Sequence, residues 1–264
     1  MCLGTAQAAV HPQVTAQSFL GMVVFSLGYP EQGLARMRAA ISEARRLAHP
    51  ATLASALGQG AKLLPFDGDN AVLDEWVDEM VAITTDQGLP HWRAGTTIYQ
   101  GWAKVKRHNI SEGISLLRSG LNAFRAIGAE MWMPQFIAFL ATAHQIAGEV
   151  EEALGLLDDA LQVVERTGER WFAAELNRLK GELLLGRGDT AVAEELYRTA
   201  VRIAQEQEAK LWELRAATSL ARLHCDQGRR SEAGDLLAAV YGWFTEGFDT
   251  LDLKAAKALL DELS

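Results

Sequence analysis

The stretch that decides the fold is GWAKVKRHNISEGISLLRSG, residues 101–120. It has small residues at positions 101, 113 and 120, a bulky apolar Leu117 and a polar turn at 107–109. A small residue lets two helix backbones approach closely, and a large apolar residue four positions later fills the neighbouring groove. The stretch therefore predicts a helical hairpin, with two helices joined at the turn.

The same pattern recurs every forty residues along the chain. The turn centres fall at 28, 68, 108, 148, 188 and 228, and five of the six are Gly, which takes a positive φ where a helix ends. Seven positions before each centre stand Gly21, Ala61, Gly101, Ala141, Gly181 and Ala221. The bulky column holds Met37, Val77, Leu117, Leu157, Tyr197 and Leu237. Columns that stay in phase over six periods predict six similar hairpins that stack on one another.

These columns have the separations of the tetratricopeptide pattern, although that repeat usually spans about 34 residues. The predicted fold class is therefore all-α: a right-handed α-α superhelix, or tetratricopeptide-like solenoid, of six 40-residue hairpins and a C-terminal capping helix. The first helices are expected near 13–27, 51–65, 91–106, 131–146, 170–186 and 210–227. The second helices are expected near 31–47, 70–86, 110–126, 150–166, 190–207 and 231–245.

We treat residues 1–264 as one repeat domain. Its units are expected at about 11–48, 49–88, 89–128, 129–168, 169–208 and 209–247, with the capping helix in 249–263. Residues 1–12 do not form a preceding hairpin, so the first helix should expose an apolar flank. Either the protein forms a homodimer through its N-terminal end, or the chain derives from a longer one.

Composition limits the partners and the compartment. The net charge of −9 argues against a nucleic-acid partner, which needs a clustered basic face. No signal peptide and no membrane-spanning apolar run is evident. The two cysteines, Cys2 and Cys225, make neither a disulfide framework nor a Cys-x-x-Cys pair. We therefore expect a soluble, reduced, cytoplasmic protein that does not bind membranes.

No pattern of residues predicts catalysis, a metal or a cofactor. The six histidines lack metal-binding spacings, and His144 and His224 share an interior column, where packing is the expected role. Phosphate-binding loops and nucleophile–base pairs are also missing from the sequence. We expect neither catalytic residues nor metal ligands nor a cofactor.

The candidate partner-binding residues lie on the concave face, which the first helix of each hairpin builds. They are Lys62, Trp102, Glu175, Arg178, Glu182, Arg215 and Arg222. Helix packing does not require their charges, so they either pair with one another or receive a charged partner segment. Trp92, Trp132, Trp171 and Trp212 begin successive first helices. They are expected to pack against the preceding second helix, the alternative being an aromatic binding strip.

The segment WFAAELNRLKGELLL, residues 171–185, resembles the C-terminal tetratricopeptide repeats of bacterial signal-transduction ATPases joined to class III adenylate/guanylate cyclase or DNA-binding domains. Residues 27–35 and 241–250 add to the likeness, which extends over roughly 10–262. The resemblance implies a sensor or scaffold that holds an ATPase and its output domain in check. No cyclase domain or nucleotide-binding loop lies in these residues, so that activity is not expected here.

Three functions follow as hypotheses. The leading one is a regulatory module that binds a protein or peptide partner, such as a cyclase or ATPase signalling protein, on its concave face. The alternative is a sensor of a small-molecule inducer, supported by aromatic residues such as Trp102 on the groove side. An enzyme is the third hypothesis and has no residues in its favour.

Overall fold

A computed structural model describes residues 10–86 and 88–263, in which fourteen helices and no strand are found. The helices are α1 Pro12–Ser26, α2 Pro30–Arg46, α3 Pro50–Ala61, α4 Leu64–Asp67, α5 Asn70–Asp86, α6 Pro90–Lys106, α7 Ile110–Ala126, α8 Met133–Ile146, α9 Val150–Thr167, α10 Ala173–Gly186, α11 Thr190–Glu206, α12 Lys210–Asp226, α13 Arg230–Tyr241 and α14 Leu251–Leu263. They form six hairpins and a final helix. The predicted tetratricopeptide-like solenoid is confirmed.

Local chemistry sets where the helices begin and end. Proline occupies the first or second position of several helices, where its missing N–H costs nothing. Each turn centre takes a left-handed backbone, with φ 96° at Gly28 and φ 91° at Gly188. His108, the one turn centre that is not glycine, adopts the same conformation with φ 62°. The turn between the two helices of each hairpin therefore requires a left-handed backbone at its centre.

The small columns mark the closest approach of the two helices in a hairpin. A Cβ added to Gly101 on α6 would lie 2.7 Å from the backbone nitrogen of Leu117 and 2.9 Å from the carbonyl oxygen of Gly113, both on α7. Real Cβ atoms do not come so near to backbone atoms. The bulky Leu117 is fully buried beside this contact, as the sequence pattern predicts.

The first helix of the second unit differs from its prediction. A continuous helix over 51–65 was expected, but α3 ends at Ala61 and the short α4 begins at Leu64. Pro65 explains the break, because its ring would clash with the carbonyl of residue 61 and it has no N–H to donate. The interruption turns Phe66 towards the C-terminal repeats, where its ring lies 4.9 Å from that of Trp212.

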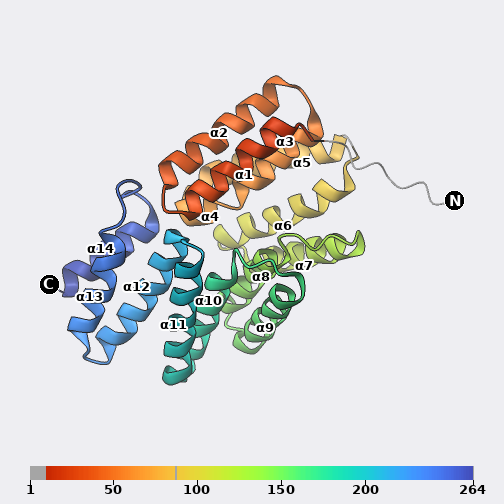
Figure 1. Ribbon diagram of the computed structural model, residues 1–264. Coiled ribbons are helices and arrows are strands. Elements are labelled where there is room, and N and C mark those ends of the chain that lie inside the picture. The colour runs from red at the N-terminus through yellow and green to blue at the C-terminus, as the bar shows by residue number, and fades with distance from the viewer. Residues whose placement is uncertain (1–9, 87, 264) are drawn as a thin grey trace.

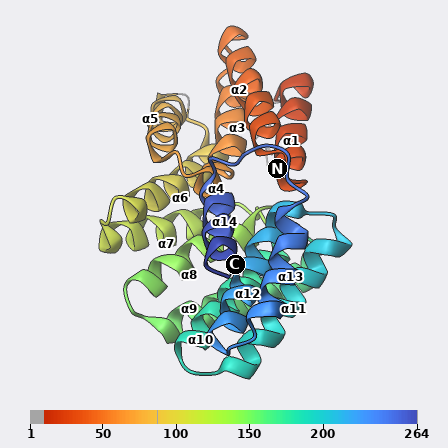
Figure 2. The ribbon, with the colours of Figure 1, turned by 90° about the vertical axis from the view of Figure 1, so that its left-hand side faces the viewer.

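The two ends of the solenoid meet. Helix α1 contacts α12 and helix α4 contacts α14, so the N-terminal hairpin lies beside the C-terminal cap (Figures 1 and 2). The side chain of Gln32 and its backbone N–H donate to Glu246 at 2.8 and 3.0 Å. The backbone N–H of Gly247 donates to Glu31 at 2.9 Å. The array is thus a closed ring, which places the first helices of the hairpins around a common centre.

Closure changes the interpretation of the N-terminal flank. Met22 and Phe25 of α1 are buried, and Met22 shares a cavity wall with Trp171 and Trp212. Only part of the flank, including Leu20 and Val23, is exposed. The apolar surface that suggested a homodimer is therefore partly covered by the chain itself.

Some expectations fall on other parts of the chain. Residues 1–9 and the thiol of Cys2 lie outside the described residues, while Cys225 is a free, half-buried cysteine. Among the described helices, none is both long and apolar enough to cross a membrane.

Candidate functional site

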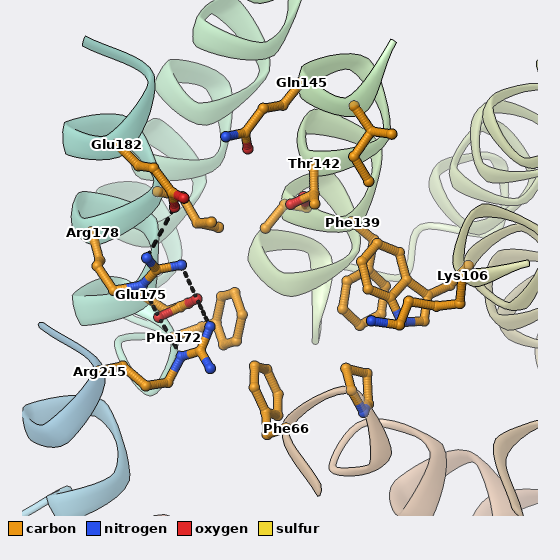
Figure 3. A pocket seen from close by; sticks show the side chains of 15 residues that line it. Phe66, Lys106, Phe139, Thr142, Gln145, Phe172, Glu175, Arg178, Glu182 and Arg215 are labelled. Carbon is orange, nitrogen blue, oxygen red and sulfur yellow. Dashed lines mark hydrogen bonds and ion pairs between the residues drawn. The ribbon is translucent and has the colours of Figure 1, made fainter. Parts of the chain in front are cut away.

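The concave face holds a cavity of about 510 Å³, here called the groove cavity (Figure 3). It lies between the first helices of successive units, on α4, α6, α8, α10 and α12. Its main lining residues are Pro65, Phe66, Trp102, Lys106, Phe139, Thr142, Gln145, Phe172, Glu175, Arg178, Glu182 and Arg215. Five of the seven predicted partner-binding residues are among them.

Charged residues form one wall of the groove cavity. The buried carboxylate of Glu175 accepts two hydrogen bonds from Arg178 at 2.9 Å, and two from Arg215 at 2.9 and 3.1 Å. Arg178 also donates to Glu182 at 3.0 Å, and Arg215 forms a second ion pair with Asp252 of α14. The charges therefore pair with one another, which was one of the two predicted interpretations.

The ion pairs control the titration of this wall. Burial alone would raise the pKa of Glu175, but the two guanidinium groups outweigh it and lower that pKa to about 2. Burial would lower the pKa of Arg215, yet Asp252 and Glu175 raise it. Glu175, Arg178 and Arg215 therefore stay charged near neutral pH, and their ion pairs make this wall a fixed network.

Across the groove cavity lies an aromatic wall with free polar groups. The ring of Trp102 stacks on Phe139 with centroids 4.6 Å apart. Trp102 is only 6% exposed, and its indole Nε1–H has no hydrogen-bond acceptor among the described residues. The ammonium of Lys106 lies 5.7 Å from the centre of this indole and forms no ion pair within the described chain. This wall therefore offers two unused donors beside an apolar surface.

The other two predicted residues lie elsewhere. Arg222 is exposed on α12, does not line the groove cavity, and makes no hydrogen bond or ion pair with the described residues. Lys62 follows α3 and is 4% exposed. It lines a separate cavity of about 530 Å³, here called the Lys62 cavity, between α1, α3, α5, α6, α7 and α8.

Lys62 is a buried amine without a carboxylate partner. Its Nζ donates to the carbonyl oxygen of Gly58 at 3.2 Å and to Oε1 of Gln59 at 3.0 Å, and it lies 4.5 Å from the centre of the Trp132 ring. No described carboxylate forms an ion pair with it. Burial lowers the pKa of Lys62 to about 7, and the more distant charge of Glu169 opposes this shift only in part.

Trp132, Trp171 and Trp212 pack in or against the hydrophobic core and also contact one another. The rings of Trp132 and Trp171 are 5.5 Å apart, and those of Trp171 and Trp212 are 5.9 Å apart. Phe19 stacks on Trp132 at 6.0 Å. The starts of three successive first helices thus place the rings of Trp132, Trp171 and Trp212 in contact. Trp92 has no ring contact with these three among the described residues, and an aromatic binding strip stays a prediction.

The structure contains no group of three or more His, Cys, Asp or Glu side chains able to hold a metal ion within residues 10–86 and 88–263. His144 and His224 are buried, as their interior column predicted, beside Glu149 and Glu194 respectively. Their surroundings are those of packed side chains.

Sequence reasoning missed Phe66 and Phe139, two aromatic residues of the groove cavity. Phe66 reaches the groove cavity because Pro65 breaks the helix, and Phe139 was not among the candidate residues. Helix α8 did carry a signal, since residues 133–141 are apolar around nearly the whole helix. A helix of that kind is surrounded by protein, which places α8 at the centre of the array.

Residues 135–206, from within α8 to the end of α11, match the tetratricopeptide repeat family. The chain therefore contains a tetratricopeptide repeat region. It is also similar to an uncharacterised protein of Rhizobium meliloti (strain 1021), with 28% identity over 215 residues. The match covers 80% of this chain and 21% of that protein, so the chain spans about a fifth of the length of this relative.

Solved structures share the fold at low identity. A Rap protein complexed with Competence and Sporulation Factor has a TM-score of 0.67 and 15% identity, over 97% of this chain and 75% of that one. Bacillus thuringiensis PlcR in complex with the peptide PapR7 and DNA has a TM-score of 0.65 and 12% identity, over 80% of this chain and 77% of its own. A kinesin light chain of Podosopora anserina with nearly identical TPR-like repeats has a TM-score of 0.51 and 19% identity, over 81% of this chain and 97% of that one. These likenesses establish the architecture.

Proposed function

We propose that this chain is a non-catalytic module that binds a short segment of a protein or peptide partner in the groove cavity. The observation that carries the proposal is the Nε1–H of Trp102, a buried donor without an acceptor on the wall of an open cavity. Leaving such a donor unpaired is costly, and a backbone carbonyl of an entering peptide would satisfy it. The adjoining Phe139 provides an apolar surface for a side chain of that peptide.

Charge suggests what the segment carries. The guanidinium groups of Arg178 and Arg215 are already bonded to carboxylates, whereas Lys106 has no ion-pair partner in the described chain. An acidic residue or a terminal carboxylate of the partner would pair with Lys106. We therefore propose a segment that combines an apolar or aromatic side chain with a nearby carboxylate.

The comparisons support a peptide or protein ligand, and the closed array favours a short one. Two proteins of the same architecture were solved with Competence and Sporulation Factor and with the peptide PapR7. In this chain the two ends of the array meet and bound the groove cavity. An open solenoid would leave that side free for a long helix to pass. A short peptide or a loop fits this enclosure better than an extended helix does.

The regulatory role belongs to the same proposal. The resemblance to cyclase–ATPase signalling proteins, and a relative about four times as long, favour a module that controls an enzyme from within a longer cytoplasmic chain. The Lys62 cavity favours the second candidate, a sensor of a small molecule.

A peptide selection tests the proposal. The purified chain is panned against a displayed library of random peptides, and the selected sequences are synthesised and titrated by calorimetry. Trp102→Phe retains a ring against Phe139 but removes the donor, so affinity should fall about tenfold. Lys106→Gln should weaken the acidic peptides, and Arg222→Ala, outside the cavity, should leave affinity unchanged. Selection of no peptide, or equal affinity for Trp102→Phe and the unaltered chain, would count against the groove cavity as the binding site.

A further inference from the structure

The Lys62 cavity has a composition that the peptide-binding proposal does not use. Its wall is mostly aromatic and apolar, including Phe19, Trp92, Tyr99, Trp132 and Phe136, and its volume of about 530 Å³ falls in the range of small-molecule sites. Polar side chains interrupt this wall, among them the ammonium of Lys62 and the hydroxyl of Tyr99. The others are Thr15, Ser55, Gln59, His91, Thr96 and Glu130, and the carboxylate of Glu130 is paired with Arg166. An apolar pocket with a few converging polar groups is the usual form of a ligand site.

The hydroxyl of Tyr99 is an unsatisfied donor. Tyr99 is 2% exposed, and its oxygen has no hydrogen-bond partner among the described residues. Its ring is fixed by edge-to-face packing on Phe136, with centroids 5.6 Å apart. A buried phenol nearly always finds a partner, so an unpaired one that lines a cavity points to a group brought in from outside.

Lys62 adds a cation that the protein does not neutralise. Its Nζ lies over the ring of Tyr99, 5.9 Å from the ring centre, and both residues line the same cavity. The nearest carboxylate that affects it, Glu169, is committed to other donors: the backbone N–H of Trp132 at 3.0 Å and the indole of Trp171 at 3.2 Å. A buried ammonium without a counter-ion is unfavourable, and an anionic ligand would relieve that cost.

Trp132 is held in place over the lysine. Its backbone is left-handed, with φ 72°, whereas Trp92, Trp171 and Trp212 at corresponding helix starts are not. This conformation is unfavourable for a bulky residue and is stabilised here by the two hydrogen bonds to Glu169. The effect is to cover Lys62 with an indole, which closes one side of the cavity.

From these contacts we infer that the Lys62 cavity binds a small planar aromatic carboxylate. Its carboxylate accepts hydrogen bonds from Lys62 and Tyr99, and its ring lies among Phe19, Trp132 and Phe136. The site is separate from the groove cavity, so the inference does not depend on whether a peptide binds in the groove cavity. It deepens the small-molecule alternative by giving the chemical class of the ligand.

A pair of isosteric probes tests the inference. The full chain is titrated by calorimetry at pH 6.5 with 2-naphthoate and with 2-naphthamide, which has the same shape but no charge. We expect 2-naphthoate to bind at least about tenfold more tightly, because only it neutralises Lys62. Equal affinities for the two probes, or no binding of 2-naphthoate, would overturn the inference.

Two substitutions identify the donors. Lys62→Met and Tyr99→Phe should each weaken 2-naphthoate, the first by at least about tenfold and the second by about three- to tenfold. Both are expected to fold, since Lys62 is an unpaired charge and the Tyr99 hydroxyl has no partner to lose, and circular dichroism verifies this. Trp102→Phe, in the groove cavity, is the matched control and should leave naphthoate binding unchanged. Wild-type affinity in folded Lys62→Met would refute the site while leaving the peptide proposal intact.

Discussion

Replacing Lys62 by methionine is expected to stabilise the protein near neutral pH. Methionine is similar in length and apolar, and it fills the space between Gly58, Gln59 and Trp132 without a charge. Removal of a buried side chain's polar group normally destabilises a fold. The opposite is expected here because Lys62 has no ion-pair partner in the described chain.

The magnitude follows from the pKa of Lys62, which burial lowers from 10.5 to about 7. This difference means that keeping Lys62 protonated in the folded state costs about 5 kcal/mol of stability. Loss of the two hydrogen bonds to Gly58 and Gln59 offsets about 1 kcal/mol each. At pH 7 only about half of the folded molecules carry the proton, which reduces the penalty to about 4 kcal/mol. The variant should therefore be more stable than the unaltered chain by about 2 kcal/mol at this pH.

The advantage should disappear as the pH rises. Above pH 7 the folded protein has released the proton of Lys62 while the unfolded chain still holds it. The unfolded state then binds more protons, so the stability of the unaltered chain increases with pH, by about 1.4 kcal/mol per unit up to about pH 10. By pH 9.5 the variant should be the less stable of the two proteins, by about 1 kcal/mol.

Urea denaturation of both proteins at pH 7, 8, 9 and 9.5 measures this difference, and all other titrating groups cancel because the two chains share them. Lys106→Met in the groove cavity is the control for a lysine-to-methionine change as such. A difference between Lys62→Met and the unaltered chain that stays constant from pH 7 to pH 9.5 would show that Lys62 is not a desolvated amine.

Two further substitutions test the packing and the ion pairs. Gly101→Ala should destabilise the fold by about 2–3 kcal/mol, because its Cβ would meet the backbone of α7. Gly95→Ala on the same helix, where the added Cβ meets nothing within 4 Å, should instead stabilise the fold by up to about 1 kcal/mol. Similar thermal midpoints for the two variants would contradict the close approach of α6 and α7. Glu175→Gln should cost about 3 kcal/mol at pH 7, since it leaves Arg178 and Arg215 without their shared carboxylate. The pKa of Glu175 is lowered to about 2, so the stabilisation that its ionised carboxylate provides is present above pH 4.5 and is lost as the pH falls towards 2. A stability difference between Glu175→Gln and the unaltered chain that does not narrow over that range would contradict this role of Glu175.

The hairpins could be predicted because their determinants are local and repeated. A small residue is needed at Gly101 because α6 and α7 touch there, and the corresponding position of each hairpin has the same requirement. The pattern is therefore repeated six times in the sequence. The break between α3 and α4 occurs once. Pro65 carried the information, but the regular spacing of its neighbours outweighed it.

The candidate site was predictable in part, for the same reason. Columns that repeat every forty residues indicated which face is concave, and five of the proposed residues do line one cavity. The columns did not show that Lys62 would be enclosed in another cavity. Its burial depends on the indole of Trp132, which the left-handed backbone and Glu169 direct towards it, and no column encodes that contact.

Closure of the ring lies beyond any pattern of neighbours, because Gln32 and Glu246 are 214 positions apart. The relevant residues were nevertheless visible. Residues 27–35 and 241–250 both carry the family resemblance, and in the structure they pack together: a Cβ added to Gly247 would lie 2.2 Å from the ring of Pro30. The two segments that carry the resemblance thus meet in a long-range contact, which the forty-residue spacing does not predict.

Closure also determines which side of the groove cavity is available to a partner. Arg215 of α12 joins Glu175 of α10 to Asp252 of α14, so the charged wall helps to hold the final helix in the ring. A partner that bonded to Arg215 would have to replace one of these buried carboxylates, and breaking a buried ion pair costs about 3–5 kcal/mol. Trp102 and Lys106 involve no such loss, because their donors are unused in the described chain. Binding should therefore depend on the aromatic wall, and the charged wall should act mainly by keeping the groove cavity in its shape.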